Sequence, residues 1–188
     1  GILVLTVNGD ITGNESHRDA TILPTDFDKV GADQVEMMGS LINYEGEIAI
    51  LSAATEAPDQ NKWIEGMKET LANDPKYSKM NLVAVVYGDD QPEKSTTEME
   101  SLLANYPNLR GVIAPTTVGI AAAAQVVQQR GISEQVQVTG LGLPSEMRDF
   151  IKDGTVKAFQ LWSPYNEGWL AAHFAKGVIE GTIKNEVG

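Results

Sequence analysis

The sequence contains no cysteine, and it is poor in basic residues and histidine. Without cysteine the chain can form neither a disulfide nor a thiolate metal site, and its compartment stays open between cytosol and bacterial periplasm. Lysine and arginine number 14 against 26 aspartates and glutamates, which gives a formal net charge of −12. Nucleic acids and anionic membranes bind through basic side chains, so we expect neither as a partner.

Long apolar stretches and catalytic motifs are also missing. No apolar run approaches the roughly 20 residues of a membrane-spanning helix. The motifs G-x-S-x-G and H-E-x-x-H are absent, no lysine follows a glycine-rich loop, and Gly140–Pro144 lacks the third glycine of a dinucleotide site. The sequence therefore predicts no catalytic residue, no metal and no cofactor. The enzymatic alternative is a small hydrolase that uses Asp10 and Asp59 as an acid–base pair.

Short apolar runs alternate with segments of helical periodicity along the whole chain. The runs, which predict buried strands, are Ile2–Val7, Glu47–Leu51, Asn81–Tyr87, Gly111–Ala114, Gln137–Leu141 and Lys157–Trp162. The periodic segments predict helices over Phe27–Ile42, Asn61–Asn73, Thr97–Asn105, Val118–Arg130, Ser145–Lys152 and Asn166–Glu180. The longest stretch predicted to be irregular is Asp10–Thr21.

This alternation predicts an α/β fold with a doubly wound parallel sheet, in three layers α/β/α. Parallel strands need crossover connections, and helices in those connections cover both faces of the sheet. The predicted strands are nearly continuous apolar runs, as expected when both faces are buried.

The segment Ala57–Trp63 is the most informative part of the chain, because it concentrates polar side chains between a buried strand and a helix. Ligands of open α/β sheets bind outside the carboxyl ends of the strands. Asp59, Gln60 and Asn61 offer there a carboxylate and two amides for a neutral, hydroxyl-rich molecule. Trp63 follows and could supply an apolar face. The alternative interpretation of Asp59 is a helix N-cap.

Small polar and aromatic residues also follow the other predicted strands. Such groups suit sugar hydroxyls, and the shortage of lysine and arginine there disfavours phosphates. Thr116 and Thr117 could instead cap the following helix. Trp162 could instead be a core residue, and Asp89–Asp90 a solvated turn. The candidate ligand-binding residues are Asp10, Asp59, Gln60, Asn61, Pro115, Thr116, Thr117 and Trp162.

Several motifs together resemble a known family. They are Leu5–Asp10, Asp59–Ile64, Tyr106–Thr117, Gly140–Arg148 and Asp153–Trp162. The order of these motifs is similar to the second lobe of a type I periplasmic sugar-binding protein, in the rhamnose and autoinducer-2 branch that serves ABC importers. The resemblance spans essentially the whole chain.

The resemblance implies how the chain is divided. Residues 1–10 would be the last strand of the first lobe and a hinge, residues 11–160 the second ligand-binding lobe, and residues 161–188 the hinge return with a first-lobe helix. The rest of the first lobe would lie outside this chain, which begins abruptly in a predicted strand. We therefore also expect self-association through uncovered apolar surface.

The resemblance also implies a function. The protein would bind a neutral monosaccharide, a rhamnose-like deoxyhexose, in the periplasm, after export by a signal peptide absent from this chain. An ABC permease in the inner membrane would be its partner. The implied ligand contacts are Asp10, Asp59, Gln60, the backbone carbonyl of Pro115, and Thr117, with Trp162 at the final hinge.

Two alternatives remain within this fold. One is an autoinducer-2 receptor, which Asp59 and Gln60 fit, although Thr116 and Thr117 differ from the Asp and Ala of those proteins. The other is the effector-sensing domain of a transcriptional repressor. The segments Pro115–Gly119 and Gly140–Met147 look more like the rhamnose-type members.

Overall fold

The computed structural model describes residues 2–11 and 13–184 and divides the chain into two compact units. Unit 1 comprises Gly1–Asp26 and Trp162–Gly188, and unit 2 comprises Phe27–Leu161. Each of the three expected segments extends beyond the described residues. The residues outside are 1 in segment 1–10, 12 in segment 11–160, and 185–188 in segment 161–188.

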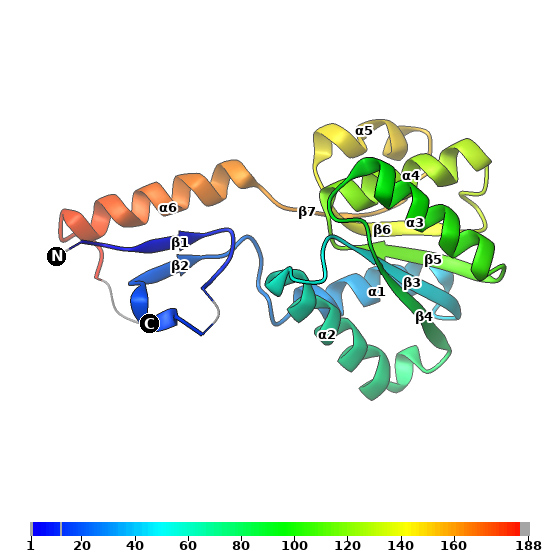
Figure 1. Cartoon of the computed structure of the whole chain (residues 1–188), viewed down its shortest axis with the longest axis horizontal. Helices are drawn as coiled ribbons and strands as arrows, with labels where there is room; N and C mark the ends of the chain where they lie inside the picture. The colour runs from blue at the N-terminus through cyan, green and yellow to red at the C-terminus, as the bar shows by residue number, and fades with distance from the viewer. Residues whose placement is uncertain (1, 12, 185–188) are drawn as a thin grey trace. The chain divides into compact units, whose positions relative to one another are not determined.

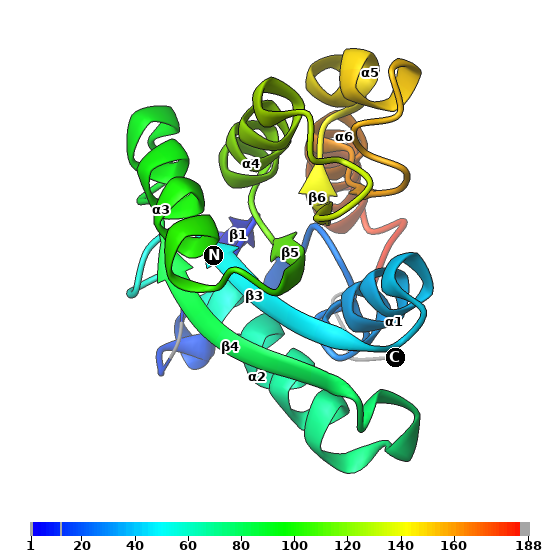
Figure 2. The same ribbon diagram turned by 90° about the vertical axis from the view of Figure 1, so that its right-hand side faces the viewer.

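Unit 2 is built on a parallel sheet of five strands in the order β4-β3-β5-β6-β7. Helices α1 and α2 cover one face of this sheet, and α3, α4 and α5 lie on the other (Figure 2). The predicted α/β fold, with a parallel sheet in three layers, is therefore confirmed. The elements are α1 (Val30–Ile42), β3 (Gly46–Ser52), α2 (Pro58–Asn73), η2 (Pro75–Tyr77), β4 (Met80–Tyr87), α3 (Pro92–Asn105), β5 (Leu109–Ala114), α4 (Thr117–Arg130), β6 (Gln137–Gly142), α5 (Pro144–Lys152) and β7 (Gln160–Leu161).

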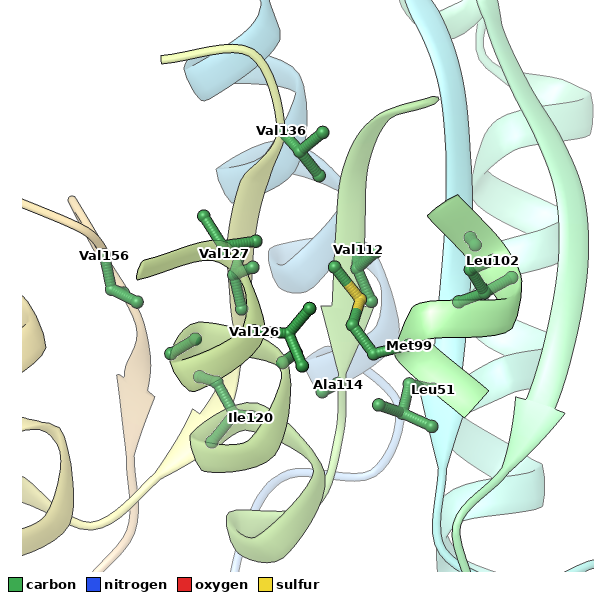
Figure 3. Packing of buried hydrophobic residues seen from close by; sticks show 14 of the residues in the cluster. Leu51, Met99, Leu102, Val112, Ala114, Ile120, Val126, Val127, Val136 and Val156 are labelled. Atoms are coloured by element: carbon green, nitrogen blue, oxygen red, sulfur yellow. The ribbon is translucent and has the colours of Figure 1, made fainter. Parts of the chain in front are cut away.

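The largest cluster of buried apolar side chains lies between the sheet and the layer of α3, α4 and α5 (Figure 3). Met99 of α3 and Ile120 of α4 are fully buried there against Val112 of β5. Alanines along α4 let this helix lie close to the strands, because a small side chain permits close approach. Burial of apolar surface of this kind is the main force that stabilises the sheet.

Four α-helices of the described part of the chain begin at a proline, and each begins one to five residues earlier than its periodicity predicts. These prolines are Pro58, Pro92, Pro144 and Pro164. Proline at the first helical position has a suitable fixed φ, and its missing N–H would have had no helical partner there. The apolar periodicity misses these first turns because they are polar.

Unit 1 contains a second, two-stranded parallel sheet of β1 (Leu5–Val7) and β2 (Ala20–Ile22). Helix α6 (Pro164–Ile179) lies alongside both strands, and the short helix η1 (Glu15–His17) connects them (Figure 1). The stretch predicted to be irregular, Asp10–Thr21, overlaps β2, and the family resemblance implies a boundary after residue 10. The structure places the boundary after Asp26, because β2 pairs with β1 and so keeps this loop in unit 1.

Within residues 2–11 and 13–184, no helix combines the length and the apolar character needed to cross a membrane.

A cluster around Glu36 joins α1 to the segment before β4. The Glu36 carboxylate accepts hydrogen bonds from Lys76 Nζ at 2.6 Å, Tyr77 at 2.6 Å and Tyr44 at 2.8 Å. Lys76 also lies over the ring of Tyr44, 4.6 Å from its centroid. These hydrogen bonds, the one from Lys76 foremost, lower the pKa of Glu36 to about 2. Burial raises the pKa of Tyr77 to about 12, and its bond to Glu36 adds to this rise.

We expect Glu36 to make the stability of unit 2 depend on pH in the acid range. A carboxyl whose pKa falls from 4.5 in the unfolded chain to about 2 when folded stabilises the fold above pH 4.5, and this contribution is lost as the pH drops toward 2. Glu36→Gln should flatten the rise of the unfolding free energy with pH over this window, and Lys76→Met should shift the loss to higher pH. Urea unfolding at several pH values measures both, and identical slopes for wild type and Glu36→Gln would contradict the expectation.

Gly140 permits the close approach of β6 to β5 near their carboxyl ends. Its φ is +144°, and a Cβ built at this position would lie 1.9 Å from the carbonyl oxygen of Ala114, its neighbour in the ladder. Both the backbone conformation and the spacing therefore exclude any larger residue without displacement of β5.

Gly140→Ala should destabilise unit 2 by about 2–4 kcal/mol, through strain at positive φ and the clash with Ala114. Gly154→Ala is the matched control, because Gly154 has φ +81° and a Cβ added to it would meet no atom within 4 Å. The control should cost about 1 kcal/mol. Urea denaturation of both variants compares them, and equal losses would show that the contact with Ala114 has no effect.

Candidate functional site

The carboxyl ends of β3, β4 and β5 meet at one edge of the unit 2 sheet, because these strands are parallel neighbours. The end of β3 is fastened to the loop after β4 by two backbone hydrogen bonds. Gly88 N–H donates to Ser52 O at 2.8 Å, and Asp89 N–H donates to Ala53 O at 2.7 Å. These bonds hold the loops that follow the two strands in one fixed arrangement.

Gln60, in the first turn of α2, binds the same end of β3 through its side chain. Its Oε1 accepts hydrogen bonds from Ser52 Oγ at 2.7 Å and from the backbone N–H of Ala53 at 2.8 Å. Because a backbone N–H can only donate, the atom that faces Ala53 must be the amide oxygen. The two N–H groups on Nε2 therefore take no part in these two hydrogen bonds.

Asp59 and Asn61 flank Gln60, and the structure gives them different roles. Asp59 is half-buried and is the second residue of α2, so the N-cap is Ala57 and the cap alternative for Asp59 is not realised. A carboxylate in a first helical turn is stabilised by the positive end of the helix dipole. Asn61 Nδ2 donates to Thr55 O at 2.8 Å, which ties the loop after β3 to α2.

Thr116 occupies the N-cap position of α4, but its hydroxyl does not cap the helix. The hydroxyl donates instead to the carboxylate of Asp90, in the loop after β4. Thr116 is only 5% exposed. The predicted cap is therefore not formed, and Asp90 is more than a solvated turn residue. Pro115 is buried beside it, and Thr117 is half-buried as the first residue of α4.

Trp63 is not the apolar face that its position in the sequence suggests. It is 4% exposed and packs edge-to-face against Phe27, with ring centroids 5.4 Å apart. Trp63 lies one helical turn further along α2 than Asp59, where side chains of this helix are buried in the core. It has no exposed ring face on which a ligand could stack.

Within unit 2 the structure brings six of the predicted residues to one edge, whereas Asp10 and Trp162 belong to unit 1. The six are Asp59, Gln60, Asn61, Pro115, Thr116 and Thr117. Asp10 is held by Arg18, whose Nε donates to Asp10 Oδ1 at 2.7 Å while Nη2 pairs with Oδ2. Trp162 is half-buried, and its indole N–H is buried with no hydrogen-bond partner among the described residues.

The charge of Asp10 is fixed by this pair. The hydrogen bonds from Arg18, followed by the backbone N–H of Ile11, lower the pKa of Asp10 to about 2 against the opposing effect of burial. A general acid at neutral pH requires a raised pKa. Asp10 is therefore unsuited to be the acid of the acid–base alternative.

Three residues with side-chain contacts to predicted site residues are absent from the prediction: Arg18 in unit 1, and Ser52 and Asp90 in unit 2, of which Asp90 is interpreted in the sequence only as part of a solvated turn. Arg18 lies in the loop predicted to be irregular, and an opposite charge eight residues from Asp10 is the signal that could have found it. Ser52 and Asp90 follow buried strands, as the predicted site residues do. Their pairing with Gln60 and Thr116 depends on which strands are neighbours.

A pocket of about 760 Å³ lies at the opposite edge of the sheet, where β3, β5 and β6 begin. It is lined by residues that include Gly46, Arg110 and Val136, and by none of the predicted site residues. Among residues 2–11 and 13–184, no group of three or more histidine, aspartate or glutamate side chains is arranged to hold a metal ion.

Comparison with solved structures gives relatives of this chain. It is 41% identical, with a TM-score of 0.86, to a sugar ABC transporter protein from Actinomyces odontolyticus, and the match covers 100% of this chain and 60% of that one. It is 39% identical, with a TM-score of 0.89, to an ABC transporter solute-binding protein from Clostridium phytofermentas with bound L-rhamnose, and this match covers 99% and 58% of the two chains. A Burkholderia graminis solute-binding protein in complex with D-arabinose is 28% identical, with a TM-score of 0.83 and coverage of 98% and 62%.

These relatives are sugar ABC transporter and solute-binding proteins, not enzymes. The chain spans about 60% of the length of the first two relatives. Residues 1–183 match the family described as "Periplasmic binding protein domain". With this match over nearly the whole chain, the protein belongs to the periplasmic binding protein domain family.

Proposed function

We propose that this chain is part of the sugar-binding component of an ABC importer, with a rhamnose-like deoxyhexose as its ligand. The observation that carries the proposal is the relative with bound L-rhamnose, which is 39% identical over 99% of this chain. The chain covers only part of that relative, so the proposal concerns the complete protein. Its location would be the periplasm, and its partner an ABC permease.

The polar edge of unit 2 forms one wall of the proposed site. Asp59 accepts hydrogen bonds from sugar hydroxyls, and Gln60 donates through Nε2, because its oxygen is already bound to Ser52 and Ala53. The Pro115 carbonyl and Thr117 supply further polar groups. A hydrogen bond to a charged group contributes roughly 1.5–3 kcal/mol, so the carboxylate dominates this wall.

Unit 1 contributes the Asp10–Arg18 pair and Trp162 in the same proposal. The pair presents both acceptor and donor atoms, which suits a neutral polyol better than an ion. We propose that unit 1 is the remainder of a first lobe and unit 2 is the second lobe. The sugar would shift the population toward a closed form, which the permease recognises.

Titration of sugars into the complete protein tests the function. L-rhamnose should bind, and Asp59→Ala should weaken its binding at least about tenfold, since about 1.4 kcal/mol corresponds to one decade. Glu56→Ala, which removes an exposed carboxylate just before α2, is the matched control and should bind as wild type. Calorimetry with a sugar panel gives the affinities.

Gln60→Glu sharpens this test, because the carboxylate still accepts from Ser52 and Ala53 but has no N–H donors. Its stability should stay close to wild type, and its affinity should fall about tenfold. Unchanged sugar affinity in Asp59→Ala would overturn the assignment of this wall. Binding of autoinducer-2 in preference to every sugar would favour the other branch of the family.

Unit 1 carries several large apolar side chains on its surface. Ile2, Tyr165, Trp169 and Ile179 are each more than half exposed. In the proposed complete lobe, further strands and helices would cover such side chains. The present chain should therefore self-associate through them, because burial of exposed apolar side chains favours association.

Light scattering of the 188-residue chain at increasing concentration should give a rising average mass, and Ile179→Glu should lower it. The same change in unit 2, Ile151→Glu in α5, is the control and should leave the mass unchanged. A monomeric mass at high concentration would count against this prediction.

A further inference from the structure

We infer that Asp90 is a positioning residue for the ligand wall of unit 2, an inference that rests on the proposed function. Asp90 accepts a hydrogen bond from the Thr116 hydroxyl. This bond keeps the hydroxyl away from the N–H groups in the first turn of α4, which it does not cap. This contact would fix the conformation of the segment Pro115–Thr117, which the proposed site uses. Asp90 itself is exposed in the loop after β4 and need not contact the sugar.

Thr116 is clamped on two sides. Its hydroxyl is bound to Asp90. Its methyl group packs against Gly119, because a Cβ built on Gly119 would lie only 2.6 Å from the methyl carbon. Threonine at an N-cap normally turns its hydroxyl toward the N–H groups two or three residues on, here those of Val118 and Gly119. The hydroxyl donates its one hydrogen to Asp90, and in the orientation that this bond gives it, its oxygen accepts from neither N–H.

The loop that carries Asp90 is itself held rigidly. Asp89 and Asp90 both have φ +51°, a conformation that residues other than glycine seldom adopt. The turn is closed by Gln91 N–H to Gly88 O at 2.9 Å, and Asp89 N–H is bound to Ala53 O. Asp90 is therefore fixed to the end of β3, where Gln60 is also bound. One hydrogen-bonded chain runs from Gln60 through the loops after β3 and β4 to Thr116.

Neighbouring Asp89 provides a matched control. It has the same φ as Asp90, so an alanine meets the same positive-φ conformation at both positions. Its carboxylate pairs with the partly exposed Lys94 of α3, which is not a wall residue. A difference between the two alanine variants therefore reports the contact with Thr116.

The affinity test uses the complete protein and L-rhamnose. Asp90→Ala should weaken binding about three- to tenfold relative to Asp89→Ala, by analogy with loss of one hydrogen bond. Asp90→Asn should restore most of the affinity, because the amide oxygen can still accept from Thr116. Thr116→Val should weaken binding to a similar extent, and the double variant Asp90→Ala, Thr116→Val should be no weaker than either single variant.

A second measurement follows amide hydrogen exchange without sugar. In Asp90→Ala the released hydroxyl should cap α4, and exchange at Val118 or Gly119 should slow. It should not slow in Asp89→Ala or in the double variant with Thr116→Val. A general loss of structure would instead speed up exchange throughout the unit.

The two proposals fail in distinguishable ways. If the wild-type protein binds no sugar, the proposed function fails, and unchanged exchange in Asp90→Ala then overturns the positioning role as well. If wild type binds sugar and Asp90→Ala binds as tightly as Asp89→Ala, the positioning role is overturned while the function stands.

Discussion

The parallel pairing of β3 with both β4 and β5 is the constraint on which the remainder of unit 2 depends. It brings three strand ends to one edge, and the bonds from Gly88 and Asp89 to the end of β3 fasten two of their loops together. Gln60 binds the same strand end from α2. An edge held by such hydrogen bonds is preorganised, and preorganisation would favour affinity at the proposed site.

Along α2, the buried apolar side chains and the polar side chains at the sheet edge occupy different turns of the helix. Trp63 and Met67 face the core, while Asp59 and Gln60 occupy the first turn at the sheet edge. The helix starts at Pro58, so the polar residues belong to the helix and have defined directions. The same separation recurs at α4, where Thr116 precedes a helix whose alanines pack on the sheet.

Charge in this protein acts locally, through pairs. Arg18 keeps Asp10 ionised, and Lys76 with two tyrosines keeps Glu36 ionised. The first pair includes a residue of the proposed site, whereas the second joins a helix to a turn far along the chain. Both carboxylates have a pKa of about 2, so the pKa does not distinguish the binding role proposed for Asp10 from the structural role of Glu36.

The sequence by itself determined the α/β class, the order of strands and helices in unit 2, and the polar character of the strand ends, because these follow from local periodicity. Only the tertiary structure decided that β2 joins β1, that Trp63 is buried, and that Thr116 is bound to Asp90 instead of capping α4. The segment that holds β2 has too few residues for a periodic signal. The other two outcomes depend on contacts between elements distant in the chain, which no local pattern encodes.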